Sequence, residues 1–175
     1  MVTGLIVNFF IPGKPVSKGR PRMTKSGFAF TPAKTRNYEA LVKMMAHEAM
    51  KGREPAEGPV QIEIVAVFPV PESWPKWKKE LAEKGDIAHT TKPDEDNIGK
   101  AISDAMNEVV YLDDQQVTRK EVFKRFESSA YRVGVRVMVR VAKGYPSQIK
   151  KRPAIDPITT PHNNEEQSCQ QKLAM

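Results

Sequence analysis

The sequence predicts a single α/β (α+β) domain with a mixed β-sheet and two or three packed helices. Three observations predict this class. Apolar and polar residues alternate along residues 60–69 and 130–142, which is the period of a strand. Apolar residues recur every three or four positions along residues 34–50 and 97–109, as on one face of a helix. The 175 residues suit one domain with a hydrophobic core of its own.

The N-terminal third is expected to hold a strand, a basic loop and a helix. Residues 5–11 predict a buried strand, which Pro12 and Gly13 end. Residues 28–30 predict a short strand before the helix of residues 34–50, where one face carries Tyr38, Leu41, Val42, Met45 and Ala49. The loop between them carries five cations: Lys14, Lys18, Arg20, Arg22 and Lys25. Such a segment either wraps a phosphate backbone or is a disordered basic loop.

The middle of the chain is expected to supply the centre of the sheet. Residues 60–69 are apolar on both faces, which is typical of a central strand. Residues 74–84 predict a short lysine-rich helix. Its Trp74 and Trp77 either seat the helix on the core or stack on nucleic-acid bases. Residues 87–91 are expected to be extended.

The C-terminal half contains the clearest helix, residues 97–109, and two predicted strands, residues 117–126 and 130–142. We expect these strands to form a hairpin through residues 127–129. One face of the second strand carries Arg132, Arg136 and Arg140, which either face solvent or contact a polyanion. The segment from Pro146 onward has four prolines, several Asn and Gln residues and few large apolar residues. The chain is therefore divided into a folded domain, residues 1–145, and a disordered tail, residues 146–175.

Composition favours a polyanionic partner and excludes several kinds of site. The net charge is +7, and neutralising phosphates with Lys or Arg releases counterions. A single cysteine excludes a disulfide within the chain, and three scattered histidines do not indicate a zinc site. The start of the chain lacks a basic signal-peptide region, and no apolar run is long enough to span a membrane. We expect a soluble, cytoplasmic protein with no membrane partner and no small-molecule cofactor.

An acidic cluster in this basic chain is the strongest chemical signal. Asp94 and Asp96 are two residues apart, so in an extended segment both carboxylates point the same way. Pro93 disfavours helix at Lys92, and Asp96 is expected at or beside the N-cap of the next helix. Paired carboxylates, with water and a substrate phosphate, are typical ligands of Mg²⁺.

Further polar residues follow on the same helix and beyond it. Lys100 and Asp104 lie four and eight residues after Asp96, which places all three on one helix face, where Asp104 is either a metal ligand or an orienting partner of Lys100. Asp113 and Asp114 follow the helix, roughly 20 Å from its start. Asp114 therefore reaches the pair only if the helix is shorter or the turn folds over; otherwise the third ligand lies elsewhere. The alternatives are a helix cap, a surface ion-pair ladder and a turn. The joint occurrence of these aspartates near one helix favours a cation site, because clustered aspartates repel DNA unless a cation intervenes.

These residues resemble the signature of the RusA-type Holliday junction resolvases. The resemblance rests on KPDEDNIGK at residues 92–100, Asp104-Ala105 and LDDQQV at residues 112–117. IPGKP at residues 11–15, KGRPR at 18–22 and FTPAKT at 30–35 also resemble the N-terminal half of that family. The resemblance covers residues 5–142 and implies a RusA-like fold, a homodimer and a bacterial or phage-encoded enzyme of DNA recombination and repair.

The resemblance also implies specific roles. It makes the protein a Mg²⁺-dependent endonuclease, with Mn²⁺ as the other candidate ion, that cuts four-way DNA junctions by paired symmetric nicks. The catalytic residues would be Asp94, Asp96, Lys100 and Asp114, with Asp113 as an adjacent metal ligand and Asp104 behind them. Expected DNA contacts are Lys14, Lys18, Arg20, Arg22 and Lys92. Dimerisation offers a further way to complete the carboxylate set across the subunit interface. The alternatives are a non-catalytic, structure-specific DNA-binding protein and a metal-dependent nuclease of flap or single-stranded DNA.

Overall fold

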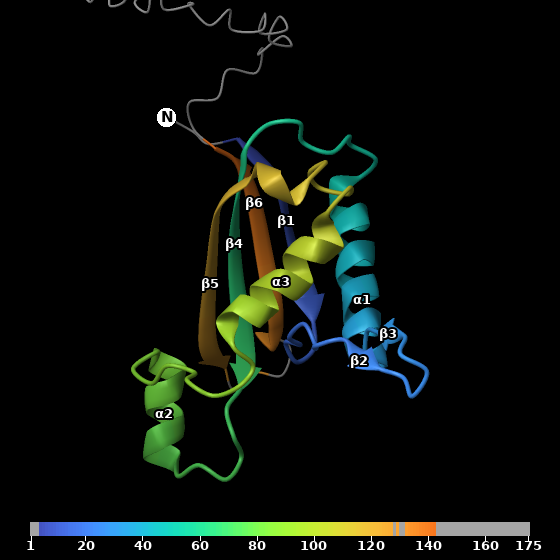
Figure 1. Cartoon of the computed structure of the whole chain (residues 1–175). Coiled ribbons are helices and arrows are strands. Elements are labelled where there is room, and N and C mark those ends of the chain that lie inside the picture. The colour runs from blue at the N-terminus through green and yellow to red at the C-terminus, as the bar shows by residue number, and fades with distance from the viewer. Residues whose placement is uncertain (1–3, 128, 130–131, 143–175) are drawn as a thin grey trace, which may run out of the picture. The chain divides into compact units, whose positions relative to one another are not determined.

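Four strands form a mixed sheet in the order β1-β6-β4-β5 (Figure 1). The computed structural model describes residues 4–127, 129 and 132–142. The strands are β1 (Leu5–Pro12), β4 (Val60–Pro69), β5 (Val117–Glu127) and β6 (Gly134–Val141). β6 pairs antiparallel with β1 and β4, whereas β4 and β5 are parallel. The described residues thus form one α/β domain with a mixed sheet, as the sequence predicts.

The expected hairpin between residues 117–126 and 130–142 is wrong, because β4 lies between β5 and β6. The central place of β4 follows from its sequence. Ile62 and Ile64 are buried on one face, and Val67 is buried on the other. A strand that is apolar on both faces is typical of the interior of a sheet. Parallel β4 and β5 need a crossover connection, which residues 70–116 supply.

Two helices, α1 (Ala33–Met50) and α3 (Glu95–Met106), cover one face of the sheet (Figure 1). The buried residues of α1 are three or four positions apart: Thr35, Tyr38, Val42, Ala46 and Met50. Leu41, Met45 and Ala49 of the predicted face are only half-buried, at its margin. The core lies between these helices and the sheet, where Ile11, Ile98 and Val137 are fully buried.

α3 begins two residues earlier and ends three residues earlier than predicted. It ends at Met106 because Asn107 leaves the helical region and Glu108 has a positive φ of 62°. Val109 follows the helical apolar spacing and is buried, but it belongs to the segment after the helix. That segment leads to the short 3-10 helix η1 (Asp114–Gln116), which precedes β5.

The third helix, α2 (Lys76–Lys84), lies beside the carboxyl end of β5 (Figure 1). Trp74 packs edge-on against Phe126, with ring centroids 5.1 Å apart. Trp77 is 62% exposed, so seating on the core explains Trp74 but not Trp77.

A two-residue ribbon of β2 (Arg22–Met23) and β3 (Ala29–Phe30) precedes α1. The basic segment therefore ends in a strand pair and is not loop throughout. No helix in the described part of the chain is long and apolar enough to cross a membrane. The predicted tail, residues 146–175, lies outside the described residues.

Candidate functional site

The segment before α3 is anchored to the carboxyl ends of β4 and β5. The Lys124 ammonium donates to the backbone oxygen of Thr91 at 2.9 Å and of Pro93 at 3.0 Å. The His89 ring is 7% exposed and stacks on Phe68, with centroids 3.8 Å apart. The backbone that leads into Asp94 is therefore fixed on two sides.

Asp94 and Asp96 occupy the first turn of α3. Asp94 is the N-cap residue, in extended geometry, and its side chain makes no capping hydrogen bond. Asp96 is the second residue of the helix, two positions after the N-cap Asp94, whereas it was expected at or beside the N-cap. The expectation of extended geometry through both residues is wrong, because only Asp94 is extended. α3 starts earlier because Pro93 excludes helix only up to Lys92. Both carboxylates are exposed, next to a helix N-terminus that favours negative charge.

Lys100 is the cation closest to this pair along α3. Its Nζ lies 3.3 Å from Asp96 Oδ2, one helical turn away. Both side chains are more than half exposed, and such surface pairs contribute only about 0–1 kcal/mol to stability. The pair is thus held too weakly to prevent either group from binding another partner.

Asp104 does not pair with Lys100, although helical spacing suggested that partnership. It forms a hydrogen-bonded ion pair with Lys18, whose Nζ also lies 3.1 Å from Glu39 Oε1. Partial burial lowers the pKa of Lys18, but the bonds to Asp104 and Glu39 outweigh it and raise this pKa overall. Lys18 therefore joins the basic segment to α1 and α3. Its predicted role in DNA binding stays a prediction.

Asp113 and Asp114 differ in their environments. Asp113 caps η1: its carboxylate accepts from the Gln115 backbone N–H at 2.9 Å, and the Gln116 side chain accepts from its N–H. The Gln115 bond lowers the pKa of Asp113. A hydrogen bond to Asp113, followed by slight burial and nearby negative charge, raises the pKa of Asp114. Asp113 thus has a structural task, whereas Asp114 caps nothing.

The two acidic groups lie at opposite ends of α3. The helix has 12 residues and is therefore about 18 Å long. Asp94 precedes its first residue, and Asp114 follows its end in η1, where the charge of Asp104 is felt. The segment after α3 does not fold back toward Asp94. Among the described residues, no three His, Cys, Asp or Glu side chains are grouped so as to hold a metal ion.

A groove of about 670 Å³ opens beside Asp94. Its walls come from three segments: residues 14–19, residues 32–35 at the start of α1, and residues 92–97 at the start of α3. The predicted DNA contacts Lys14 and Lys92 line the groove. Arg20 is exposed and directly follows Gly19, which is a lining residue. Lys34 also lines the groove. Sequence reasoning gave no role to Lys34, although Lys34 lies in the FTPAKT segment, or to Lys124, which no sequence pattern indicated.

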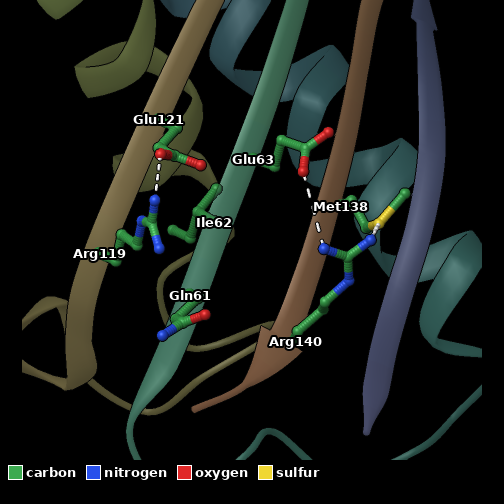
Figure 2. A pocket seen from close by; sticks show the side chains of 7 residues that line it. All are labelled: Gln61, Ile62, Glu63, Arg119, Glu121, Met138 and Arg140. Atoms are coloured by element: carbon green, nitrogen blue, oxygen red, sulfur yellow. Dashed lines mark hydrogen bonds and ion pairs between the residues drawn. The ribbon is translucent and has the colours of Figure 1, made fainter. Parts of the chain in front are cut away.

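The opposite face of the sheet carries a separate hollow of about 100 Å³ (Figure 2). Its charges pair with one another: Arg140 lies 3.7 Å from Glu63, and Arg119 lies 2.5 Å from Glu121. These side chains project from strands whose other face is covered by α1 and α3 (Figure 2). The hollow is small and internally neutralised, and it has no part in the site at Asp94.

Comparisons with known proteins identify the family of this chain. Residues 12–139 match the family model described as endodeoxyribonuclease RusA. Nucleases of this family are metal-dependent. The chain is also 38% identical over 136 residues to the uncharacterized protein YqaN of Bacillus subtilis (strain 168), an alignment that covers 75% of this chain and 94% of that protein. The chain belongs to the RusA endodeoxyribonuclease family.

Proposed function

We propose that this protein is a Mg²⁺-dependent endodeoxyribonuclease that resolves four-way DNA junctions by paired, symmetric nicks. The observation that carries the proposal is the placement of Asp94, Asp96 and Lys100 on the first turns of α3, beside a lysine-lined groove. Carboxylates at the edge of a cationic groove suit metal-assisted cleavage of a polyanion. Membership of the RusA family supports the same activity and substrate.

The donor chemistry of the first turn of α3 fits Mg²⁺ and Mn²⁺. Asp94 and Asp96 offer hard oxygen ligands, and neither carboxylate is used up by a capping bond. Mg²⁺ usually keeps several waters and takes one or two carboxylates together with substrate phosphate. Both carboxylates are exposed, which leaves room for water and for a phosphate. This pair is therefore the proposed core of the metal site.

The residues have separate tasks in strand cleavage. The bound ion supplies Lewis-acid polarisation of the scissile phosphate and lowers the pKa of an attacking water. Asp94 and Asp96 hold that ion at the mouth of the groove. The Lys100 ammonium, 3.3 Å from Asp96, neutralises charge that develops on the phosphate during in-line attack. The water oxygen joins phosphorus and gives up a proton to solvent, the bond to the 3′ oxygen breaks, and that oxygen takes up a proton from solvent, so the nick carries a 5′ phosphate and a 3′ hydroxyl.

Asp114 is the proposed third carboxylate, and we assign it to the second subunit of a homodimer. Within one chain, a helix of about 18 Å separates it from Asp94. A two-fold dimer can place the end of one α3 against the start of the other, because isologous contacts are reciprocal. Two such sites in one assembly would explain two symmetric cuts. Asp113 caps η1 and is not proposed as a ligand.

Cleavage of a synthetic four-way junction in Mg²⁺ tests the proposal. We expect symmetric nicks in opposing strands and little cutting of a linear duplex of the same sequence. Asp94→Asn should bind the junction without cutting it, whereas Glu95→Gln, on the neighbouring exposed residue, should cut normally. Equal cutting of flaps, single strands and junctions would instead identify a general nuclease. Binding without cleavage under all metal conditions would identify a structure-specific binding protein.

A further inference from the structure

The groove beside Asp94 is cationic along its length. Four charged side chains line it: Lys14, Lys34, Lys92 and Asp94. Each lysine comes from a different wall, so the three ammonium groups surround the groove. All three lysines are exposed. Asp94 is the one acidic residue in the lining and belongs to the proposed metal site.

The walls are held in place by specific contacts. The Lys18 backbone N–H donates to the backbone oxygen of Asn97 at 2.8 Å, which joins the basic segment to α3. The Gly19 N–H donates to Thr35 Oγ1 at 3.1 Å, which joins the same segment to α1. Gly19 allows this approach because a Cβ there would lie 2.8 Å from Thr35 Oγ1. The ion pairs of Lys18 to Glu39 and Asp104 add a third attachment. The groove is therefore built before any ligand binds.

The dimensions of the groove suit the backbone of one DNA strand better than a whole duplex. A volume of about 670 Å³ lies within the range of sites that enclose ligands of drug-like size, roughly 300–1,000 Å³. A nucleotide is such a ligand, whereas a duplex is far larger. A positively charged groove that follows a single backbone is the usual way in which proteins hold one strand.

We propose that the groove binds backbone phosphates of the strand that is cut, next to the scissile phosphate, and that Lys34 is a phosphate ligand there. The proposal rests on the proposed function, because it takes DNA cleavage at Asp94 as its starting point. Lys34 is the new element. It comes from α1, not from the segment that carries the acidic motif, and it lines the same groove as Lys92 and Asp94.

Salt-dependent binding to a labelled four-way junction in EDTA provides the first test. Because each phosphate contact releases counterions, Lys34→Ala should weaken binding and lower the slope of log affinity against log salt by about 1. Lys43→Ala is the matched control, since Lys43 is exposed on the same helix and lies outside the groove lining. Its slope should equal that of the wild type. Equal slopes for both variants would overturn the proposal.

The second test locates the phosphate. Single phosphates near the cut site are replaced, one at a time, by neutral methylphosphonates. At the phosphate that Lys34 contacts, the methylphosphonate should lower the affinity of the wild-type protein. The affinity of Lys34→Ala should be the same with and without that methylphosphonate. If the difference in affinity between wild type and Lys34→Ala were the same at every methylphosphonate position, the assignment would be overturned.

Binding and cleavage separate this inference from the proposed function. If the wild type never cuts a junction but Lys34→Ala lowers the salt slope, Lys34 is a phosphate ligand, whereas the nuclease proposal fails and with it the placement beside a scissile phosphate. If the wild type cuts junctions but Lys34→Ala behaves like Lys43→Ala, the nuclease proposal stands and the groove assignment fails.

Discussion

The Lys124 ammonium lies 3.0 Å from the backbone oxygen of Pro93, the residue immediately before Asp94. It also donates to the Thr91 oxygen, so one cation on β5 fixes two carbonyls of the turn that leads into α3. Hydrogen bonds from a charged donor contribute more than neutral ones, roughly 1.5–3 kcal/mol each. Lys124 is half-buried, which limits competition from water. It therefore acts on the acidic site through the backbone, as a positioning residue.

Replacement of Lys124 should weaken metal binding before it affects the fold. Lys124→Met keeps the length and apolar part of the side chain but loses both carbonyl bonds. We expect the Mg²⁺ concentration for half-maximal cleavage to rise about 10-fold, since loss of residues that orient metal ligands typically costs 10- to 100-fold. Cleavage at saturating Mg²⁺ should recover most of the wild-type rate. Lys120→Met, on the same face of β5, is the control, and an identical Mg²⁺ requirement in both variants would refute the role.

The sequence predicted the sheet and most helix positions because these depend on local periodicity. The alternation of valines placed β6 correctly, and the two apolar faces of β4 predicted its central position. The order of strands could not be predicted in the same way. Residues 117–126 and 130–142 are neighbours in sequence, but β4 lies between them and pairs with both, which depends on contacts between distant segments.

Long-range contacts explain what the sequence did not reveal about the site. Helical spacing suggested Lys100 as the partner of Asp104, yet Asp104 pairs with Lys18, 86 positions away. Lys124 contacts Pro93 across 31 positions, and no local pattern in β5 indicates it. The distance between Asp94 and Asp114, in contrast, was foreseen, because helix length follows directly from residue count. The structure retains that separation within one chain.

Asp113 and Asp114 should respond differently to substitution. Asp113→Ala removes the carboxylate that caps η1, so we expect a lower melting temperature with cleavage retained at low temperature. Asp114 makes no capping bond, so Asp114→Asn should keep the wild-type melting temperature while losing cleavage. Thermal melting of each variant, together with junction cleavage well below its melting temperature, checks the pair. Loss of cleavage in folded Asp113→Ala, with normal cutting by Asp114→Asn, would reverse the assignment.

His89 should make folding stability depend on pH. Burial, followed by the positive charge of Lys124, lowers its pKa below the ordinary value of 6.5. The unfolded chain therefore takes up a proton first as pH falls. The stabilisation from neutral His89 is complete above pH about 6.5 and is lost as pH falls from there through the lowered folded pKa. Denaturant unfolding between pH 7.5 and pH 5 measures it.

A variant pair isolates the contribution of His89. His89→Phe keeps an aromatic ring beside Phe68 and should flatten the dependence of unfolding free energy on pH in this range. His47→Gln, at an exposed position on α1, should leave the wild-type dependence intact. If His89→Phe retained the full dependence, another group would be responsible.

Mixed dimers should show whether Asp94 and Asp114 act in one site from different chains. Asp94→Asn and Asp114→Asn are each expected to be inactive alone. In a mixed dimer with cross-subunit sites, one site carries both defects and the other carries none, because Asp94 and Asp114 are both intact in it. Co-refolded variants should therefore nick one strand of a junction, at about a quarter of the wild-type number of cuts, because half of the randomly paired dimers are mixed and each has one intact site. If both carboxylates acted within a single chain, each site would keep one defect and mixing would restore nothing. Asp94→Asn mixed with Asp96→Asn is the control, because both residues lie at the start of α3 in the same chain. Every site of this mixed dimer keeps one defect, so mixing should restore no cleavage.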